Sequence, residues 1–188
     1  MKAIAVDPTR STQTPECFTE IDIEPPTLGA RDLLVRVRAV SVNPADYKVR
    51  SSIKAEQSAP QILGWDAAGV VEQVGEKVTL FQPGDEVYYA GSITRPGSNS
   101  ELHAVDERIV GRKPKSLAFE QAAALPLTTI TAWEALFDRM AISAQAPETN
   151  HNKRLLIIGG AGGVGSIAIQ LAKQVAGLTV IQISSFNN

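Results

Sequence analysis

Up to about residue 110, the sequence consists of short stretches in which apolar and polar residues alternate. Val35, Val37 and Ala39 are separated by two arginines, which is the pattern of a half-buried antiparallel strand. Strands are predicted over 32–43, over 67–75, after the Pro83-Gly84-Asp85 turn, and over 101–110. Because no sustained helical period occurs before about residue 110, this part is predicted to be mostly β, as an open barrel or sandwich.

The pattern then changes to helical spacing. Residues 117–125 are alanine-rich and predict a helix that Pro126 ends or kinks. A second helix is predicted over 129–140, where apolar residues recur every three or four positions, and residues 142–153 are expected to form a loop. We place the organisational boundary at about residues 116–126.

A nucleotide-binding pattern follows. Residues 155–158 are continuously apolar, as in a strand buried on both faces of a parallel sheet, and an amphipathic helix and a second strand over 178–184 come after the glycines. This order of strand, glycine turn and helix favours a dinucleotide site, although a glycine-rich connection without a ligand is the alternative. The predicted cofactor-binding residues of the turn are Gly160, Gly162, Gly163, Val164 and Gly165.

The end of the second strand bears on which dinucleotide is bound. An acidic residue there would bond the ribose hydroxyls of NAD, but no Asp or Glu occurs from Thr149 to Asn188. Ser184 and Ser185 stand in this region and would tolerate a 2′-phosphate. The sequence therefore favours NADP, or NADPH in its reduced form, although no arginine is present there to pair with the phosphate.

Composition narrows the function classes. The 188 residues are 44% hydrophobic and 20% charged with a net charge of -2, so no basic footprint argues for nucleic acid or an anionic membrane. The single cysteine, Cys17, excludes an internal disulfide and a cysteine-cluster metal site. With no apolar run long enough to span a bilayer and no signal-like start, we expect a cytoplasmic protein with small-molecule partners.

Five segments, in this order, carry a family resemblance: VSVNPADYKVR, LGWDAAGVVEQVG, FQPGDEVYYAG, LPLTTITAWEAL and GGAGGVGSIAIQLAK. Together they resemble the medium-chain dehydrogenase/reductase superfamily, in its branch of zinc-independent quinone oxidoreductases and alkenal/enone reductases. The resemblance implies an α/β chain, with a GroES-like β domain over 1–125 and the start of a Rossmann domain over 126–188. It also implies an active-site cleft between the two domains.

The resemblance also bears on metal binding. Zinc-dependent relatives carry a cysteine ligand just after the strand that ends here at Asn43, and a histidine ligand where this chain has Trp65. Neither ligand is present, and His103, His151 and Cys17 show no ligand spacing. We therefore expect no metal.

Without a metal, a carbonyl substrate must be polarised by hydrogen-bond donors. The candidates are Asn43, Tyr47 and Lys48, and the resemblance to enone reductases favours Lys48 as the cation that stabilises a developing enolate. The alternatives are a turn at Asn43, a helix cap at Asp46 and a solvated Lys48.

Two further residues are assigned by the resemblance. Trp65 is expected to form an apolar wall of the cleft, the alternative being ordinary core packing. Thr128 matches a position that approaches the nicotinamide in relatives, although hydroxyls are also common at helix starts.

These assignments predict an NADPH-dependent, metal-independent reductase that transfers hydride to a quinone or an α,β-unsaturated carbonyl. The alternatives are a zinc-type alcohol dehydrogenase and a non-catalytic relative that senses a dinucleotide or is structural. Residues 155–188 hold only one strand, one helix and one further strand, so we expect these 188 residues alone to be inactive. Their incompletely covered sheet is expected to associate, giving a homo-oligomer.

Overall fold

The computed structural model describes residues 1–188 except 12–13, 55–58 and 185–188. It divides into two compact units, which we call unit 1 (Met1–Leu127) and unit 2 (Thr128–Asn188). Unit 1 contains β1 (Lys2–Val6), β2 (Phe18–Asp22), β3 (Asp32–Ser41), α1 (Pro44–Ser52), β4 (Gln61–Ile62), β5 (Asp66–Val74), β6 (Glu86–Ala90), β7 (Leu102–Asp106), β8 (Val110–Arg112) and α2 (Phe119–Ala123). Helix α3 (Pro126–Trp133) begins at the end of unit 1, and unit 2 contains β9 (Arg154–Ile158), α4 (Gly163–Gln174) and β10 (Thr179–Ile183).

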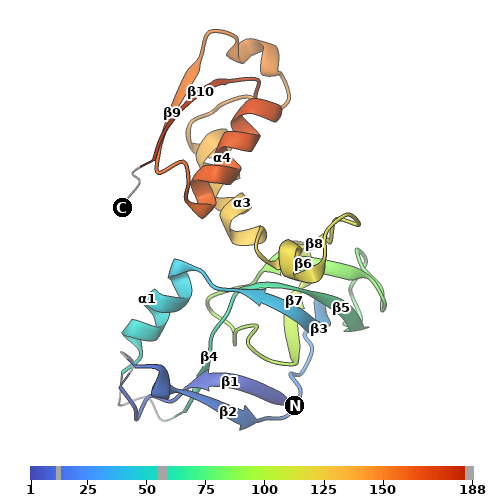
Figure 1. Ribbon diagram of the computed structural model, residues 1–188. Coiled ribbons are helices and arrows are strands. Elements are labelled where there is room, and N and C mark those ends of the chain that lie inside the picture. Colours follow the sequence, from blue (N-terminus) through green and yellow to red (C-terminus); the bar gives the residue numbers. More distant parts are fainter. Residues whose placement is uncertain (12–13, 55–58, 185–188) are drawn as a thin grey trace. The chain divides into compact units, whose positions relative to one another are not determined.

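The main sheet of unit 1 has the order β7-β3-β5-β6-β8, with every neighbouring pair antiparallel (Figure 1). Its inward-facing residues form the largest core of the unit, which includes Leu33, Val35, Val71, Val87, Tyr89 and Val105. The alternation that predicted the strand over 32–43 is confirmed, because Val35 is fully buried while the neighbouring Arg36 is exposed. The β-rich character of the N-terminal part is thus confirmed.

One predicted strand, over 101–110, is in fact two. The side chain of Asp106 accepts a hydrogen bond from the backbone N–H of Arg108 and caps a 3-10 turn at Glu107–Ile109, which separates β7 from β8. The buried Glu107 carboxylate accepts bonds from the backbone N–H groups of Thr79 and Leu80 at 2.8 Å each. The turn is therefore held by polar contacts that the strand pattern does not reveal.

A smaller sheet, β2-β1-β4, was not predicted, and helix α1 was indicated only by the alternative that Asp46 caps a helix. Helix α1 has a polar sequence, PADYKVRSS, without an apolar stripe, so periodicity did not predict it. It is instead started by Pro44 in its first turn and by Asp46, whose carboxylate accepts a bond from the Asn43 backbone N–H. Val49 of α1 packs against the core that Val6, Cys17, Ile53, Leu63 and Trp65 form.

The helices after residue 115 differ in their bounds from the prediction. Helix α2 is shorter than the predicted 117–125, and its Ala122 and Ala123 pack against Ala68 of β5. Pro126 does not merely end α2 but is the first residue of α3, where its missing N–H costs no hydrogen bond. A helix was predicted over 129–140. In the structure α3 ends at Trp133, and a π-helical segment, Glu134–Arg139, follows it directly.

Unit 2 is a β-α-β arrangement in which β9 and β10 pair in parallel, with Leu155 opposite Val180. Helix α4 packs on one face of this pair, where Leu155, Ala172 and Leu178 are buried. The other face carries Leu156, Ile158, Ile181 and Ile183, which are 54%, 79%, 50% and 54% exposed. Residues 155–158 are thus buried on one face only in this chain, because α4 covers alternate side chains, and this agrees with the expectation of an incompletely covered sheet.

Candidate functional site

The start of α1 positions the first candidate residues. Asn43 is buried, and its backbone N–H donates to the Asp46 carboxylate at 2.7 Å. One turn further on, Tyr47 is 58% exposed and Lys48 is also exposed, so both offer their polar ends to solvent. The helix-cap interpretation of Asp46 thus fits the structure, and Lys48 and Tyr47 are the accessible donors of the group.

A buried carboxylate, Asp66, lies beside this helix start. The Asn43 side-chain amide donates to Asp66 Oδ2 at 2.7 Å, and the backbone N–H of Leu127 donates to Oδ1 at 2.8 Å. Burial raises the pKa of Asp66 to about 6, with a smaller contribution from the neighbouring Asp46, against the lowering effect of its two donors. Asp66 was not among the predicted site residues, because its hydrogen-bond partners are distant from it in the sequence.

Trp65 both packs in the core and lines a pocket. It is 5% exposed, contacts the core around Val6 and Leu63, and its indole Nε1 donates to the Ser92 carbonyl at 3.1 Å. A pocket of about 370 Å³ is lined by Trp65, by Val49 of α1 and by Ile93, among others. The two interpretations of Trp65, core residue and apolar wall, are therefore compatible within unit 1.

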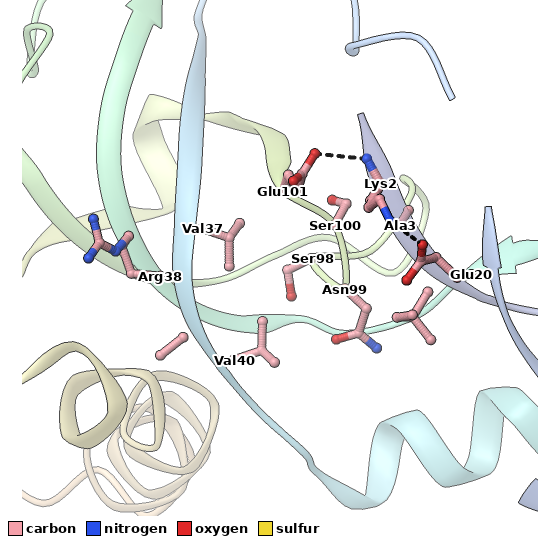
Figure 2. Close-up of a pocket in the computed structure, with 12 residues that line it drawn as sticks. Lys2, Ala3, Glu20, Val37, Arg38, Val40, Ser98, Asn99, Ser100 and Glu101 are labelled. Carbon is pink, nitrogen blue, oxygen red and sulfur yellow. Dashed lines mark hydrogen bonds and ion pairs between the residues drawn. The ribbon is translucent and has the colours of Figure 1, made fainter. Parts of the chain in front are cut away.

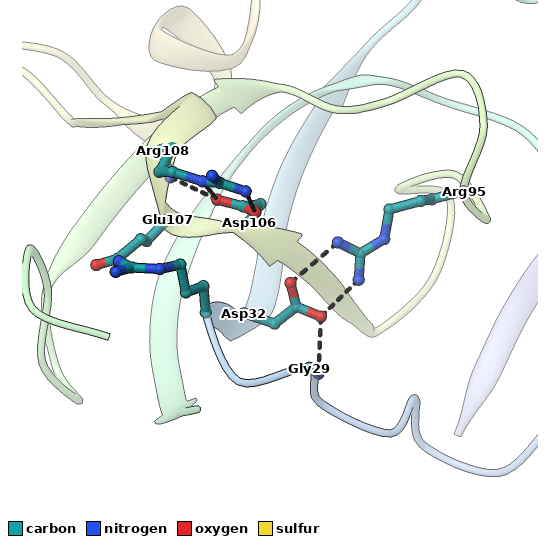
Figure 3. Close-up of polar contacts among 7 residues, drawn as sticks. Gly29, Asp32, Arg95, Asp106, Glu107 and Arg108 are labelled. Atoms are coloured by element: carbon teal, nitrogen blue, oxygen red, sulfur yellow. Dashed lines mark hydrogen bonds and ion pairs between the residues drawn. The ribbon is translucent and has the colours of Figure 1, made fainter. Parts of the chain in front are cut away.

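The loop that carries Ile93 is anchored by an ion pair. Arg95 donates to both carboxylate oxygens of Asp32, at 3.0 and 2.6 Å, and the Gly29 backbone N–H donates to the same carboxylate at 2.9 Å (Figure 3). The hydrogen bond from Arg95 outweighs the burial of Asp32 and lowers the pKa of this carboxyl. Since Asp32 begins β3, the loop is tied to the main sheet of unit 1.

His103 holds the same loop from another side. Its Nε2 lies 3.0 Å from the Pro96 carbonyl and its Nδ1 lies 2.9 Å from the Tyr89 hydroxyl. Burial lowers the pKa of His103 to about 4, so the ring is neutral at pH 7. A neutral ring that donates from Nε2 to Pro96 and accepts at Nδ1 from Tyr89 satisfies both contacts, which gives His103 a structural role.

A larger and more open pocket, of about 560 Å³, lies between β1 and β3 (Figure 2). Its charged lining residues are Lys2, Glu20, Arg38 and Glu101, and its apolar lining includes Val37 and Val40. None of the predicted site residues lines this pocket, so it is separate from the candidate site of unit 1.

In unit 2 the glycine turn has the geometry that its spacing predicts. Gly159 has φ of +76°, a conformation that favours glycine, and this residue was missed because the pattern was counted from Gly160. A Cβ on Gly165 would lie 2.4 Å from the Gly159 carbonyl oxygen, so helix α4 and the turn approach closely only with glycine there. Gly162 immediately precedes α4, and a Cβ on Gly163 would lie 3.1 Å from the Thr128 methyl group. Val164 lies in the first turn of α4.

The end of β10 lies beside this turn. The Gly159 backbone N–H donates to the Ile183 carbonyl at 2.8 Å, and Ser184 Oγ donates to the Gln182 side chain at 2.8 Å. The Gln182 side chain in turn lies against Gly160. The structure thus brings Ser184, Gly160 and Thr128 to one end of unit 2, while Ser185 lies outside the described residues.

A dinucleotide, which the resemblance implies, and zinc, which the zinc-dependent relatives bind, fit these residues differently. The open backbone of Gly162 and Gly163 at the start of α4, with nothing near a Cβ on Gly159, suits a phosphate group. Among the described residues, no group of three or more His, Cys, Asp or Glu side chains is arranged to hold a metal ion. An amide at Asn43 and an indole at Trp65 are not zinc ligands, so the donor set does not fit zinc.

The described part of the chain contains no helix that is both long enough and apolar enough to cross a membrane.

Comparisons with known proteins agree with this architecture. The alcohol dehydrogenase GroES-like domain family matches residues 29–124. The chain is 46% identical over 185 residues to a zinc-type alcohol dehydrogenase-like protein of Staphylococcus epidermidis, covering 98% of this chain and 54% of that protein. It is 41% identical to the chloroplastic NADPH-dependent alkenal/one oxidoreductase of Arabidopsis thaliana, covering 86% of this chain and 42% of that protein.

A solved structure shows the same similarity. The quinone oxidoreductase of Coxiella burnetii has a TM-score of 0.81 at 31% sequence identity, over 100% of this chain and 57% of that one. The chain therefore belongs to the alcohol dehydrogenase GroES-like family, within the quinone and alkenal reductase branch of the medium-chain dehydrogenase/reductases. It consists of a GroES-like domain and the beginning of a Rossmann domain, and it spans about half the length of the curated relatives it matches.

Proposed function

We propose that this chain carries the substrate-polarising part of an NADPH-dependent, metal-independent reductase of quinones or α,β-unsaturated carbonyls. The single observation that carries the proposal is the start of α1, where a buried polar anchor at Asn43 is followed by two exposed donors, Tyr47 and Lys48. Support comes from relatives whose names describe an alkenal/one oxidoreductase and a quinone oxidoreductase.

In this proposal the residues of unit 1 stabilise charge on the substrate. NADPH, when bound, supplies the hydride. As the β-carbon of an enone gains that hydride, negative charge develops on the carbonyl oxygen, and the Lys48 ammonium stabilises it electrostatically. Tyr47 acts as a second, neutral donor or supplies the proton that the product needs. The side chains of Trp65 and Val49 supply apolar surface to a neighbouring pocket, which Thr94 and Arg95 line as well.

The proposed cofactor site is the glycine turn of unit 2. Gly160, Gly162, Gly163, Val164 and Gly165 supply the close backbone approach and the α4 start, and Thr128 lies against Gly163. We favour NADPH over NADH because Ser184 stands where a carboxylate would repel a 2′-phosphate. Ser185 was predicted together with Ser184 to tolerate a 2′-phosphate, and it remains part of the proposed cofactor site.

Zinc-type alcohol dehydrogenase activity is the alternative that the name of the Staphylococcus relative raises. It would need ligands that Asn43 and Trp65 do not provide. Elemental analysis of extensively dialysed protein separates the two functions, since we expect well under one zinc per chain. Stoichiometric, tightly held zinc would support the alcohol dehydrogenase.

The test of the proposed function is a Lys48→Met substitution in a chain extended to the length of its relatives. Losing the cation should lower turnover of a quinone or simple enone by roughly a hundredfold, the scale of losing one oxyanion donor. Binding of NADPH should stay near normal, because in the proposal Lys48 contacts the substrate carbonyl and the glycine turn holds the cofactor.

Lys115→Met is the matched control, since Lys115 is exposed and lies outside the pocket and α1. An unchanged turnover rate for Lys48→Met would indicate that Lys48 is a solvated surface charge without a role in the reaction. An extended wild-type chain that binds NADPH but reduces neither acceptor would instead favour the non-catalytic, dinucleotide-sensing alternative.

A further inference from the structure

Asp66 receives hydrogen bonds from two segments that are distant in the sequence. It is the first residue of β5 and its side chain is fully buried. Oδ2 accepts from the side-chain amide of Asn43, immediately before α1, and Oδ1 accepts from the backbone N–H of Leu127, in the first turn of α3. Both carboxylate oxygens are thereby engaged by the segments on which candidate site residues are carried.

The Asn43 contact fixes where α1 begins. The Asn43 backbone N–H donates to Asp46 and its carbonyl accepts from the Asp46 backbone N–H at 3.0 Å, so the residue joins the helix by its backbone. Its side chain is then free to reach Asp66. Tyr47 and Lys48 follow within the next turn, so a displacement of Asn43 would displace both donors.

Fold stability alone does not explain a carboxylate at this place. An ionised group without a cationic partner is costly to bury, and Asp66 accepts its hydrogen bonds from two neutral donors. A second carboxylate, Asp46, lies near enough to raise the pKa of Asp66 further. Groups that cost stability in this way are concentrated at functional sites.

We propose that Asp66 is a positioning residue, whose carboxylate holds Asn43 and thereby sets the place of Lys48 and Tyr47 at the candidate site. Its role in catalysis rests on the function proposed above, whereas its role in ordering α1 does not. Asp66 touches neither substrate nor cofactor in this role and acts through Asn43.

An exchange of the two side chains tests the proposal. In Asn43→Asp, two carboxylates face each other and cannot both ionise without repulsion. In Asp66→Asn, the new amide can accept from Leu127 and donate to Asn43 once the Asn43 amide turns over. In the double exchange, Asn at 66 donates to Asp at 43 and still accepts from Leu127, so each hydrogen bond is restored with the original net charge.

The first readout is amide hydrogen exchange in the 188-residue chain. Asn43→Asp should speed exchange over 44–52 by about tenfold, and the double exchange should return it to within about threefold of wild type. Exchange in β6 is the control and should stay near wild type. Equal exchange in the single and double variants, or equal acceleration of 44–52 and β6, would overturn the positioning role.

The second readout is kinetic and uses the chain extended to the length of its relatives. Asn43→Asp should lower kcat for an enone with the Kd for NADPH unchanged, and the double exchange should recover most of the loss. Failure of the double exchange to recover kcat would overturn the catalytic side of the proposal. A wild-type chain without turnover would contradict the proposed function alone, because the exchange experiment still decides whether Asp66 orders α1.

Discussion

The two units differ in how they satisfy buried polar groups. Unit 1 buries several charged side chains, and three of them, Asp32, Asp66 and Glu107, accept hydrogen bonds from distant segments. In unit 2, Asn150 is the only buried polar side chain among the described residues, and its amide donates to the carbonyls of Ser143 and Ala176. Unit 1 thus combines its core with several buried carboxylates that accept long-range hydrogen bonds, whereas the described part of unit 2 has one buried polar side chain and one packed face.

The largest expected effect comes from completing unit 2. A doubly wound domain places the two halves of a dinucleotide on two β-α-β-α-β halves, and unit 2 holds one β-α-β arrangement. We expect the 188-residue chain to show no measurable NADPH-dependent turnover and a chain extended through a complete Rossmann domain to be active. A side-by-side assay with a quinone and a simple enone measures this. Equal activity would contradict the assignment of the glycine turn.

The next largest expected effect is on the free energy of unfolding, when one leucine in each unit is replaced by alanine. Leu33 is fully buried in the main sheet, whereas Leu156 is 54% exposed. Leu33→Ala should lower the free energy of unfolding of unit 1 by about 3–5 kcal/mol, because it removes apolar contacts and leaves a cavity. Leu156→Ala should lower that of unit 2 by less than about 1 kcal/mol.

The two tryptophans allow the units to be followed separately, because Trp65 lies in unit 1 and Trp133 in unit 2. Denaturant unfolding in a Trp133→Phe background reports on unit 1 through Trp65. If both leucine variants lost stability equally, the proposed difference in packing between the units would be wrong.

A smaller effect is the pH dependence that Asp66 gives to unit 1. Its pKa in the folded state is about 6, above the ordinary 3.8, so between these values the folded state binds more protons than the unfolded state. The contribution of Asp66 to stability is therefore highest below pH 4 and is lost as the pH rises through about 6.

Asp66→Asn removes this titration. Relative to that variant, the wild type should lose on the order of 2 kcal/mol of unfolding free energy between pH 4 and pH 7. Urea unfolding of both proteins across this pH range measures the difference. Parallel curves for the two proteins would show that Asp66 is not a buried acid with a raised pKa.

The smallest effect concerns the uncovered face of unit 2. Burial of Ile158 or Ile181 between copies would remove apolar surface from water, so we expect self-association through this face. Ile158→Lys should weaken the association about tenfold or more, as measured by sedimentation velocity. Leu80→Lys, at a 53% exposed site in unit 1, is the control and should change nothing. Unaltered association of Ile158→Lys would place the contact elsewhere.

The same contrast explains which features were predictable from the sequence. Periodicity is a local signal, and it located the core-facing positions of β3, such as Val35, and the helix after the glycine turn. The spacing of Gly160, Gly162 and Gly165 identified the turn because its geometry is set within a few residues.

Asp66 was not predictable in the same way. Its partners, Asn43 and Leu127, lie 23 and 61 residues away, and they meet only because the sheet register and the start of α3 bring them together. Periodicity did not predict helix α1 either, since its start depends on the side chain of Asp46 and not on an apolar stripe, and only the helix-cap alternative at Asp46 indicated it. Polar anchors of this kind become visible only once tertiary structure is known.

The order of strands in the main sheet has a consequence for folding. β3 pairs with β5 on one side and with β7 on the other, and β7 is made long after β3. The nascent chain therefore carries β3 with one open edge while the intervening loops are being synthesised, and closing that edge requires a long loop. β9 and β10 are joined by α4 alone, so their contacts are more local and are expected to form faster. We expect the rate-limiting event in folding of this chain to be the docking of β7 against β3.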